Sequence, residues 1–277
     1  MLSRELQGKT KVVLQGDGGD EIFGGYRRYR TLAKLPFRST LATTVAFFMQ
    51  MLPSIGGGYD RKMRYLKALK QSDDAFLMAL LLTVETLDFC PTQIFSKEIR
   101  SKFHGIDPFL AYQNCAQRFS NLDIVKKMMY TDTQLILPNI FLEKVDRPTM
   151  AFGIEARVPM LDYELTDYVM ALPSNIKVKN GEQKWLLKKA VKSILPNHII
   201  NSPKTGFGVP YEYWIKGPLK DFLNDTLLTL QRQKPYLLDW KFLARMIDLN
   251  NTGLKEKSFL AWKSLNLMLW LLDNDTV

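Results

Sequence analysis

The sequence predicts an α/β protein that is mainly helical, with a short strand close to the N-terminus. Apolar residues recur at helical spacing in five segments that are separated by polar residues, proline or glycine. These segments are residues 74–84, 109–119, 124–137, 219–230 and 259–272. Residues 12–14, Val-Val-Leu, lead into a glycine-rich turn, which is typical of a short buried strand. No internal repeat or low-complexity linker interrupts the chain, so we expect one domain over residues 1–277.

The turn after the expected strand carries the strongest chemical signal. Residues 16–25 read Gly-Asp-Gly-Gly-Asp-Glu-Ile-Phe-Gly-Gly. Its glycines let backbone amides approach a phosphate or acyl group, whereas Asp17, Asp20 and Glu21 add negative charge. Because carboxylates repel phosphates, the combination indicates a cation between them, and Mg²⁺ usually binds through one or two carboxylates plus phosphates. The alternative is a polar turn whose acidic side chains cap the next helix.

Later segments complete a pattern of motifs that is known from one family. Together with the turn, they resemble the synthetase domain of glutamine-hydrolysing asparagine synthetases, with its Gly-Asp/Glu-Gly-x-Asp-Glu-x-Phe-x-Gly-Tyr, Glu-x-Arg-x-Pro-x-Leu-Asp and Pro-Lys-x-Gly-Phe patterns. The resemblance is strong over residues 11–214 and looser to residue 272. The segments are residues 141–162 (FLEKVDRPTMAFGIEARVPMLD), 183–189 (QKWLLKK), 195–196 (LP) and 202–210 (SPKTGFGVP).

The resemblance implies a fold and a reaction. The fold is that of the ATP-pyrophosphatases, similar to the adenine nucleotide α-hydrolases, of which this chain would be a mainly helical fragment with a short parallel-strand remnant. The reaction is the amidation of aspartate in asparagine biosynthesis, with ATP and Mg²⁺ as cofactors and with ammonia derived from glutamine. The aspartate carboxylate attacks the α-phosphorus of ATP, and ammonia then displaces AMP from the acyl-adenylate. Such an enzyme is expected in the cytoplasm.

The resemblance also assigns catalytic residues. Asp17 matches an acid implicated in forming or aminating the adenylate, and Glu155 lies in the segment that lines the acyl pocket. Lys184 matches the lysine that stabilises negative charge on the α-phosphate or acyl oxygen. Two alternatives stay open: Glu155 and Arg157 can form a structural ion pair, and the lysines can form a solvated helix face. Those lysines are Lys184, Lys188, Lys189 and Lys192.

Further residues are assigned to binding or bracing by the same resemblance. Asn139 and Lys188 depart from the family, which often has Asp and Arg at these positions, so the acyl substrate stays open. The assignments are Asp20 to Mg²⁺, Gln15, Gly16 and Gly18 to the nucleotide, Glu21 and Arg157 to the substrate, Asp146 and Arg147 to bracing the acyl pocket, and Lys204, Gly206 and Phe207 to a loop near the nucleotide.

Two features of the family have no counterpart in this sequence. Relatives begin with a glutaminase domain whose N-terminal cysteine is the nucleophile, but here Leu2 follows Met1. Their synthetase domain opens with a Ser-Gly-Gly-x-Asp-Ser pyrophosphate loop, which is also not found. We therefore expect residues 1–277 to be the C-terminal portion of a synthetase domain that lacks the glutaminase domain and the pyrophosphate loop. A separate N-terminal half is one way to supply them, and the isolated chain is expected to be incomplete.

Composition and charge argue against three other classes of protein: nucleic-acid-binding, membrane-spanning and disulfide-rich. The net charge of +10 and the basic residues at 27–34 and 61–70 invite a nucleic-acid interpretation, but these residues fall at helical spacing without interleaved aromatics, so solvated faces are favoured. The apolar runs 41–52 and 76–84 are shorter than the roughly 20 residues of a membrane span. Cys90 and Cys115 are too few for a disulfide framework. We expect neither a nucleic-acid nor a membrane partner.

Three hypotheses about function remain open. The first is an amide-forming enzyme of the asparagine synthetase type, or a cousin that makes β-lactams or macrolactams and often has Tyr where Asp17 stands. The second is a non-catalytic or split-enzyme binding subunit. The third is a basic helical module whose binding to nucleic acid weakens with salt.

Overall fold

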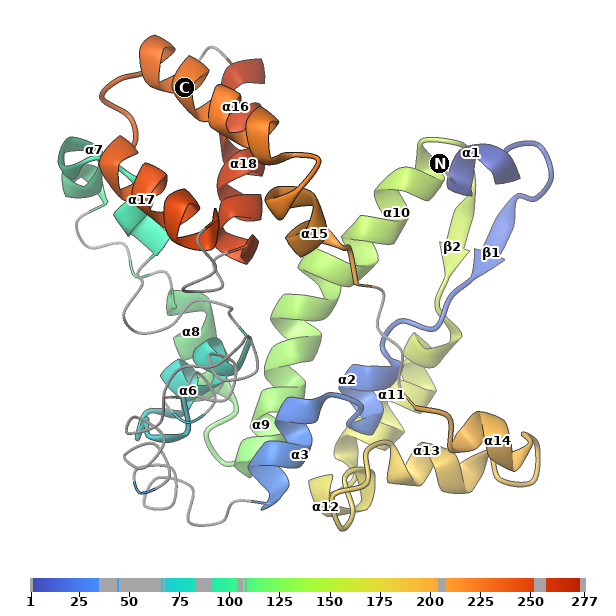
Figure 1. Ribbon diagram of the computed structural model, residues 1–277. Helices are drawn as coiled ribbons and strands as arrows, with labels where there is room; N and C mark the ends of the chain where they lie inside the picture. The colour runs from blue at the N-terminus through green and yellow to red at the C-terminus, as the bar shows by residue number, and fades with distance from the viewer. Residues whose placement is uncertain are drawn as a thin grey trace. The chain divides into compact units, whose positions relative to one another are not determined.

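The computed structural model describes residues 2–34, 44, 66, 68–82, 91–103, 107, 109–203, 208–251 and 258–274 (Figure 1). These residues are mostly helical and contain a two-stranded parallel sheet, in agreement with a mainly helical α/β chain. Contacts group the chain into a first unit, residues 1–41, 71–79 and 108–203, and a second unit, residues 42–70, 80–107 and 204–277. Several expectations lie wholly or largely outside the described residues: the runs 41–52 and 61–70, Cys90, and the loop with Lys204, Gly206 and Phe207.

The first unit contains the sheet and many short helices. The helix expected at residues 109–119 is present as α8, and the strand expected at residues 12–14 is present as β1. The elements are α1 (Leu2–Leu6), β1 (Val12–Leu14), α2 (Gly19–Phe23), α3 (Arg27–Lys34), the start of α6 (Asp74–Leu82), α8 (Leu110–Arg118), α9 (Ile124–Thr131), η2 (Asp132–Leu142), α10 (Glu143–Met150), β2 (Glu155–Arg157), η3 (Pro159–Leu161), α11 (Tyr163–Ala171), α12 (Ser174–Lys177), α13 (Trp185–Ala190) and α14 (Asn197–Ile200).

The second unit is built from helices around one apolar cluster. Leu223, Leu227 and Leu230 recur at helical spacing on one face of α16, and α18 buries a corresponding row. The helices expected at residues 219–230 and 259–272 are therefore confirmed. The described elements of this unit are η1 (Pro91–Ile94), α7 (Lys97–Lys102), α15 (Tyr211–Lys216), α16 (Lys220–Gln233), α17 (Trp240–Asn251) and α18 (Ser258–Asp273).

A long helical run forms the spine of the first unit. The helix expected at residues 124–137 begins as α9, continues as the π-helical segment η2 and passes into α10 (Figure 1). Asp123 caps its start, because its carboxylate accepts from the backbone N–H groups of Val125 and Lys126 at 3.0 Å. Pro138 lies inside η2, where it has no N–H to donate and its ring crowds the preceding turn. The wider π geometry at this point is a kind of local distortion that often accompanies functional sites.

The sheet is small and open. β1 and β2 pair in parallel, with Val12 opposite Glu155 and Leu14 opposite Arg157. The expectation of a buried strand is wrong in one respect, because the side chain of Leu14 is 72% exposed. Parallel sheets are normally covered by helices on both faces. An exposed leucine on a two-stranded parallel sheet therefore marks a surface on which further elements can pack.

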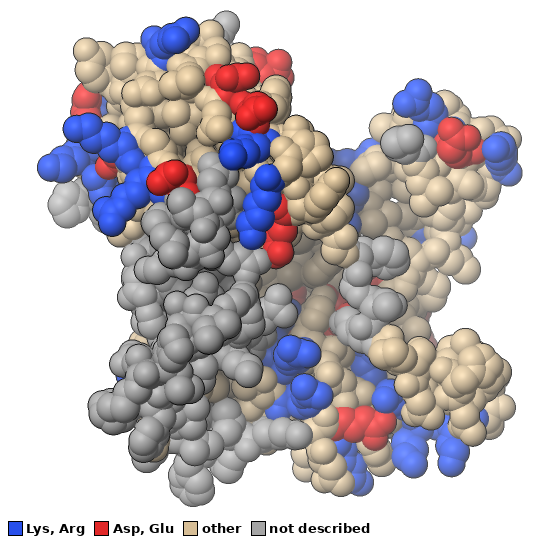
Figure 2. Space-filling model, in the orientation of Figure 1, with Lys and Arg blue, Asp and Glu red and all other residues tan. Residues whose placement is uncertain are grey.

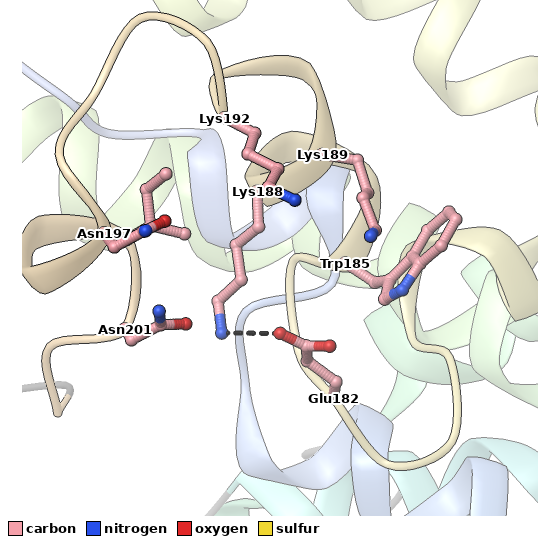
Figure 3. Close-up of a pocket in the computed structure, with 8 residues that line it drawn as sticks. Glu182, Trp185, Lys188, Lys189, Lys192, Asn197 and Asn201 are labelled. Atoms are coloured by element: carbon pink, nitrogen blue, oxygen red, sulfur yellow. Dashed lines mark hydrogen bonds and ion pairs between the residues drawn. The ribbon is translucent and has the colours of Figure 1, made fainter.

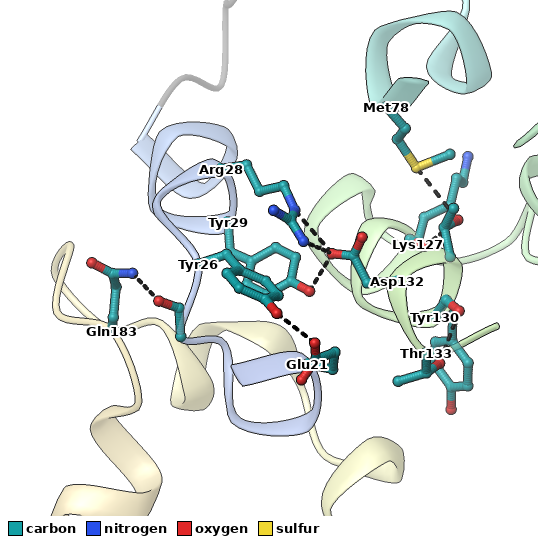
Figure 4. Close-up of polar contacts among 12 residues, drawn as sticks. Glu21, Tyr26, Arg28, Tyr29, Met78, Lys127, Tyr130, Asp132, Thr133 and Gln183 are labelled. Carbon is teal, nitrogen blue, oxygen red and sulfur yellow. Dashed lines mark hydrogen bonds and ion pairs between the residues drawn. The ribbon is translucent and has the colours of Figure 1, made fainter. Parts of the chain in front are cut away.

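A buried ion pair joins the N-terminal helices to the spine (Figure 4). The Arg28 guanidinium lies 2.9 Å from the Asp132 carboxylate, and the Tyr29 hydroxyl donates to the same oxygen. The Asp132 side chain is fully buried, and its second oxygen has no hydrogen-bond partner among the described residues. Burial raises the pKa of Asp132 to about 6, although Arg28 and Tyr29 oppose this rise. The pair therefore fixes α3 against the spine at a cost in desolvation.

Lys177, at the end of α12, is buried and makes no ion pair with a described residue. It is 0% exposed, and the hydrogen bond that the structure gives its ammonium is to the Met170 sulfur at 4.0 Å. Burial, helped by the charge of Lys126, lowers the pKa of Lys177 to about 8, although the charge of Asp123 opposes this shift. An ammonium in this position destabilises the fold, because no ion pair with a described residue offsets the desolvation of its charge.

We expect the Asp132 carboxyl to make the stability of the chain fall as pH rises from about 4 to about 6.5. The folded chain keeps the proton up to about pH 6, whereas the unfolded carboxyl releases it near its usual pKa of 3.8, so the folded state binds more protons in this window. The loss is on the order of 3 kcal/mol. Denaturant unfolding of wild type and D132N across this range measures it. D167N, at an exposed position, should keep the wild-type slope, and equal slopes in wild type and D132N would contradict the assignment.

We expect Lys177→Met to stabilise the chain at neutral pH, because methionine fills similar space without a charge. In wild type, stability should rise by about 3 kcal/mol between pH 8 and 10.5, where the unfolded lysine binds the proton and the buried one has released it. K177M should lose this rise, as measured by denaturant unfolding at pH 7 and pH 10.5. K9M removes an exposed lysine and serves as the control; a gain in K9M as large as in K177M would exclude burial as the cause.

Candidate active site

The glycine-rich turn forms an elbow between β1 and α2. Gly18 begins α2 with a φ of +85°, a left-handed conformation that glycine adopts without strain. A Cβ at Gly18 would lie 2.2 Å from the Leu161 side chain, so the elbow also packs too closely against η3 for any larger residue. The chain thus turns sharply after the strand and presents Asp17 and Asp20 from the turn and the first helical turn. Asp17 is half-buried.

The elbow meets the segment that carries Lys184. The Lys184 ammonium lies 2.8 Å from the Asp20 carboxylate, and the two side chains are 32% and 23% exposed. Lys184 is the N-cap of α13 and has a φ of +53°, which is uncommon for a residue with a Cβ. Asp20 and Lys184 are far apart in the sequence, and the motif resemblance places both in one active site. In the structure, their side chains contact each other.

A tight hairpin delivers Lys184 to the elbow. Lys179 and Glu182 exchange backbone hydrogen bonds of 3.1 and 2.8 Å across Asn180 and Gly181, both of which have positive φ. An Asn-Gly pair is the usual sequence for such a turn. Lys184 follows this hairpin by two residues and leads directly into α13.

Gly25 and Gln183 shape the contact between Asp20 and Lys184. The Gly25 N–H donates to the Asp20 backbone carbonyl at 2.8 Å, and the Gln183 side-chain amide donates to the Gly25 carbonyl (Figure 4). A Cβ at Gly25 would lie 1.8 Å from the Asp20 carboxylate and 2.4 Å from the Lys184 side chain. The motif resemblance gave no role to Gly25 or Gln183. The Gly-Gly pair before Tyr26 could have indicated that the backbone is closely approached at Gly25.

Glu21 points into the interior rather than toward the elbow surface. It is 2% exposed, and its carboxylate accepts from the Tyr26 hydroxyl at 2.5 Å (Figure 4). Burial raises the pKa of Glu21, while the hydrogen bond from Tyr26 lowers it. The Arg28 guanidinium stacks 3.8 Å from the centroid of the Tyr26 ring. This geometry favours a structural role for Glu21 over the expected contact with substrate.

Glu155 and Arg157 project to the same side of β2. The Arg157 guanidinium contacts the Glu155 carboxylate at 2.8 Å, and the side chains are 62% and 56% exposed. The hydrogen bond and charge of Arg157 lower the pKa of Glu155. The ion pair left open as an alternative is therefore present, and both side chains remain accessible. The Gln15 N–H donates to the Arg157 carbonyl at 3.0 Å, which places the start of the elbow beside them; Gly16 is exposed.

Arg147 and Asn139 make local contacts in the spine. Arg147 pairs with Glu143 one turn earlier in α10, and its side chain is 78% exposed. Bracing of the acyl pocket by Asp146 and Arg147 stays a prediction. The Asn139 amide donates to the Leu135 carbonyl at 2.8 Å, inside η2.

The carboxylates of the elbow suit Mg²⁺ only when a bound substrate supplies further oxygen ligands. Within the described residues, no group of three or more His, Cys, Asp or Glu side chains could hold a metal ion. Glu21 is engaged by Tyr26, which leaves Asp17 and Asp20 as the carboxylates of the elbow. One or two carboxylates fit Mg²⁺ when substrate phosphates complete its octahedral shell.

The basic residues that the structure describes lie in several separate places on the face in Figure 2. Arg28 is withdrawn from solvent by its ion pair with Asp132. On the face in Figure 2, Lys and Arg lie in separate places and alternate with Asp and Glu.

Two other expectations concern membranes and disulfides. In the part of the chain that the structure describes, no helix has the length and apolar character needed to span a bilayer. Cys115 is a free thiol.

The family of the chain follows from comparison with known proteins. The asparagine synthase profile matches residues 1–272. The glutamine-hydrolysing asparagine synthetase 1 of Bacillus subtilis is 25% identical over 97% of this chain, and a putative glutamine-hydrolysing asparagine synthetase of Mycobacterium bovis is 30% identical over 97%. Amidase chyE of Penicillium rubens is 25% identical over 86%.

These relatives are considerably longer than this chain. The matched region is 41%, 40% and 38% of the Bacillus, Mycobacterium and Penicillium proteins. The elbow, the Glu155–Arg157 strand and the Lys184 segment all fall inside the matched residues, and on this basis the chain belongs to the asparagine synthase family.

Proposed function

We propose that this chain takes part in the ATP-dependent amidation of aspartate through an acyl-adenylate. The observation that carries the proposal is the 2.8 Å contact between Asp20 and Lys184, because it puts a candidate metal-binding acid and a candidate phosphate-binding cation in one place. Membership in a ligase family supports an enzyme, and the names of the Bacillus and Mycobacterium relatives support asparagine as the product.

The proposed reaction has two steps. An oxygen of the aspartate side-chain carboxylate bonds to the α-phosphorus of ATP, and pyrophosphate leaves. The nitrogen of ammonia then bonds to the acyl carbon, and AMP leaves with the oxygen that joined it to the acyl group. Asp17 accepts the proton that the nitrogen loses, a role that requires hydrogen-bond reach to the incoming amine.

Lys184 and Asp20 exchange partners in this scheme. With nucleotide bound, Asp20 would hold Mg²⁺, and the ion would supply positive charge to offset that of the pyrophosphate. Lys184 then donates to the oxygen on which negative charge develops, on the α-phosphate or the acyl group. The partial exposure of both side chains supports this exchange, since an ion pair open to water is weakly held. Gln15, Gly16 and Gly18 present backbone to the nucleotide, and Glu155 and Arg157 line the acyl side.

The remaining residues of a complete enzyme are proposed to dock on the open sheet. The chain spans about 40% of the length of the Bacillus and Mycobacterium relatives. Leu14 is exposed on the face of the sheet. Within the described residues β1 pairs only with β2, so its other edge can accept a further strand. An N-terminal half that docks there would supply the pyrophosphate loop and ammonia from glutamine.

A second candidate function is amide formation on another acyl substrate. The Penicillium relative carries the name amidase, and Asn139 stands where family members often have Asp. The two functions share the adenylation step and differ in the acyl group. Amino-acid-dependent exchange between ATP and pyrophosphate separates them: exchange that requires aspartate supports asparagine synthesis, and exchange without response to aspartate supports the second candidate.

We expect D20N and K184M each to lower aspartate-dependent ATP–pyrophosphate exchange about 100-fold or more in an enzyme reconstituted with the N-terminal half, because each removes charge stabilisation from the transition state. D225N and K216M make the same changes at exposed positions of the second unit and should keep activity. If D20N and K184M retain turnover within threefold of wild type while folding normally, the centre is not at this ion pair.

We expect the isolated chain to show negligible exchange, and addition of an N-terminal half to restore it. The backbone amides of β1 should then become protected from hydrogen exchange, because new strand pairing removes them from water. Residues around Leu228, which is 49% exposed in the second unit, serve as the reference. Strong exchange by the chain alone, or restored activity without protection of β1, would contradict this docking.

A further inference from the structure

A pocket lies on the face of the first unit where α13 approaches α14 (Figure 3). Its volume is about 170 Å³. The pocket does not contain Asp17, Asp20 or Lys184, so it is separate from the candidate active site. The residues that line it are Glu182, Trp185, Lys188, Lys189, Lys192, Asn197, Ile200 and Asn201.

Positive charge accumulates in this pocket. Lys188 is paired with Glu182 at 2.9 Å, which neutralises one ammonium. Lys189 and Lys192 make no ion pair with any described residue. Two positive charges therefore remain in excess inside one concave surface.

Neutral donors face the lysines across the pocket. The carboxamides of Asn197 and Asn201 come from the α14 side and point into the pocket (Figure 3). Neither carboxamide has a hydrogen bond to a described residue. Each carboxamide carries two N–H donors, so the pocket offers directed donors as well as charge.

Trp185 lines the pocket and contacts two ammonium groups. The Lys179 ammonium lies 4.3 Å from the centroid of the Trp185 ring, and the Lys189 ammonium lies 5.6 Å from it. These cation–π contacts orient the two ammonium groups.

Size and chemistry together define the ligand class. Pockets for drug-sized molecules and cofactors have volumes of about 300–1,000 Å³, well above the value here. Three ammonium groups against the single carboxylate of Glu182, together with the N–H donors of two carboxamides, favour an anion with several oxygens. We propose that this pocket, the oxyanion pocket, binds one phosphate-type oxyanion, either inorganic phosphate or pyrophosphate, between Lys189, Lys192 and the two asparagines.

The proposal is tested by titrating the 277-residue chain with sodium phosphate and, separately, with sodium pyrophosphate by calorimetry, without nucleotide or Mg²⁺. We expect one site per chain. The tighter-binding salt identifies which oxyanion the pocket prefers. K189Q/K192Q should weaken binding at least tenfold. N197A/N201A should weaken it at least threefold although the charge is unchanged, which separates a built site from diffuse attraction.

Matched variants distinguish this site from general charge and from the active site. K97Q/K102Q removes two exposed lysines of α7 and should bind within twofold of wild type. K184M should also bind within twofold, so the result is independent of the proposed amidation. A loss below tenfold in K189Q/K192Q, an equal loss in K97Q/K102Q, or a loss that follows K184M instead would overturn the proposal.

Discussion

The contact between Asp20 and Lys184 is the interaction on which the proposed active site depends. Because both side chains are partly exposed, the ion pair itself contributes only about 0–1 kcal/mol and cannot impose its own geometry. The surrounding backbone imposes it instead, through the space that Gly25 leaves open and the hairpin turn at Asn180 and Gly181. A weak pair in a fixed position can release its partners to a ligand without unfolding what surrounds it.

The sequence predicted the local elements well and their burial less well. Residues 12–14, 109–119, 219–230 and 259–272 form the expected strand and helices, because hydrophobic spacing and turn residues act over a few positions. The exposure of Leu14 depends on how many strands flank β1, which no local pattern encodes. The π geometry of η2 has a local cause in Pro138, yet proline alone predicts a kink or a break as readily as a widened turn.

The site was predictable as a set of residues but not as a set of contacts. Motif resemblance selected Asp20 and Lys184, which the structure brings together, whereas their roles stay predictions. The motif resemblance assigned Glu21 to the substrate, and the helical spacing of Arg28 favoured a solvated face. Each is buried by a partner that spacing does not reveal, Tyr26 for Glu21 and the distant Asp132 for Arg28. The buried Lys177 had no sequence signal, since nothing near it in the chain marks an interior position.

The same short helix serves the candidate active site and the oxyanion pocket. α13 has six residues, too few to be stable without tertiary contacts, so its order depends on what holds its two ends. Lys184 at its start is held by Asp20, whereas Lys188 and Lys189 near its end face a pocket with unbalanced positive charge. An oxyanion bound there would reduce this positive charge, whereas the contact between Lys184 and Asp20 at the other end of α13 would stay unchanged. The two sites can therefore share one short helix and still be tested separately.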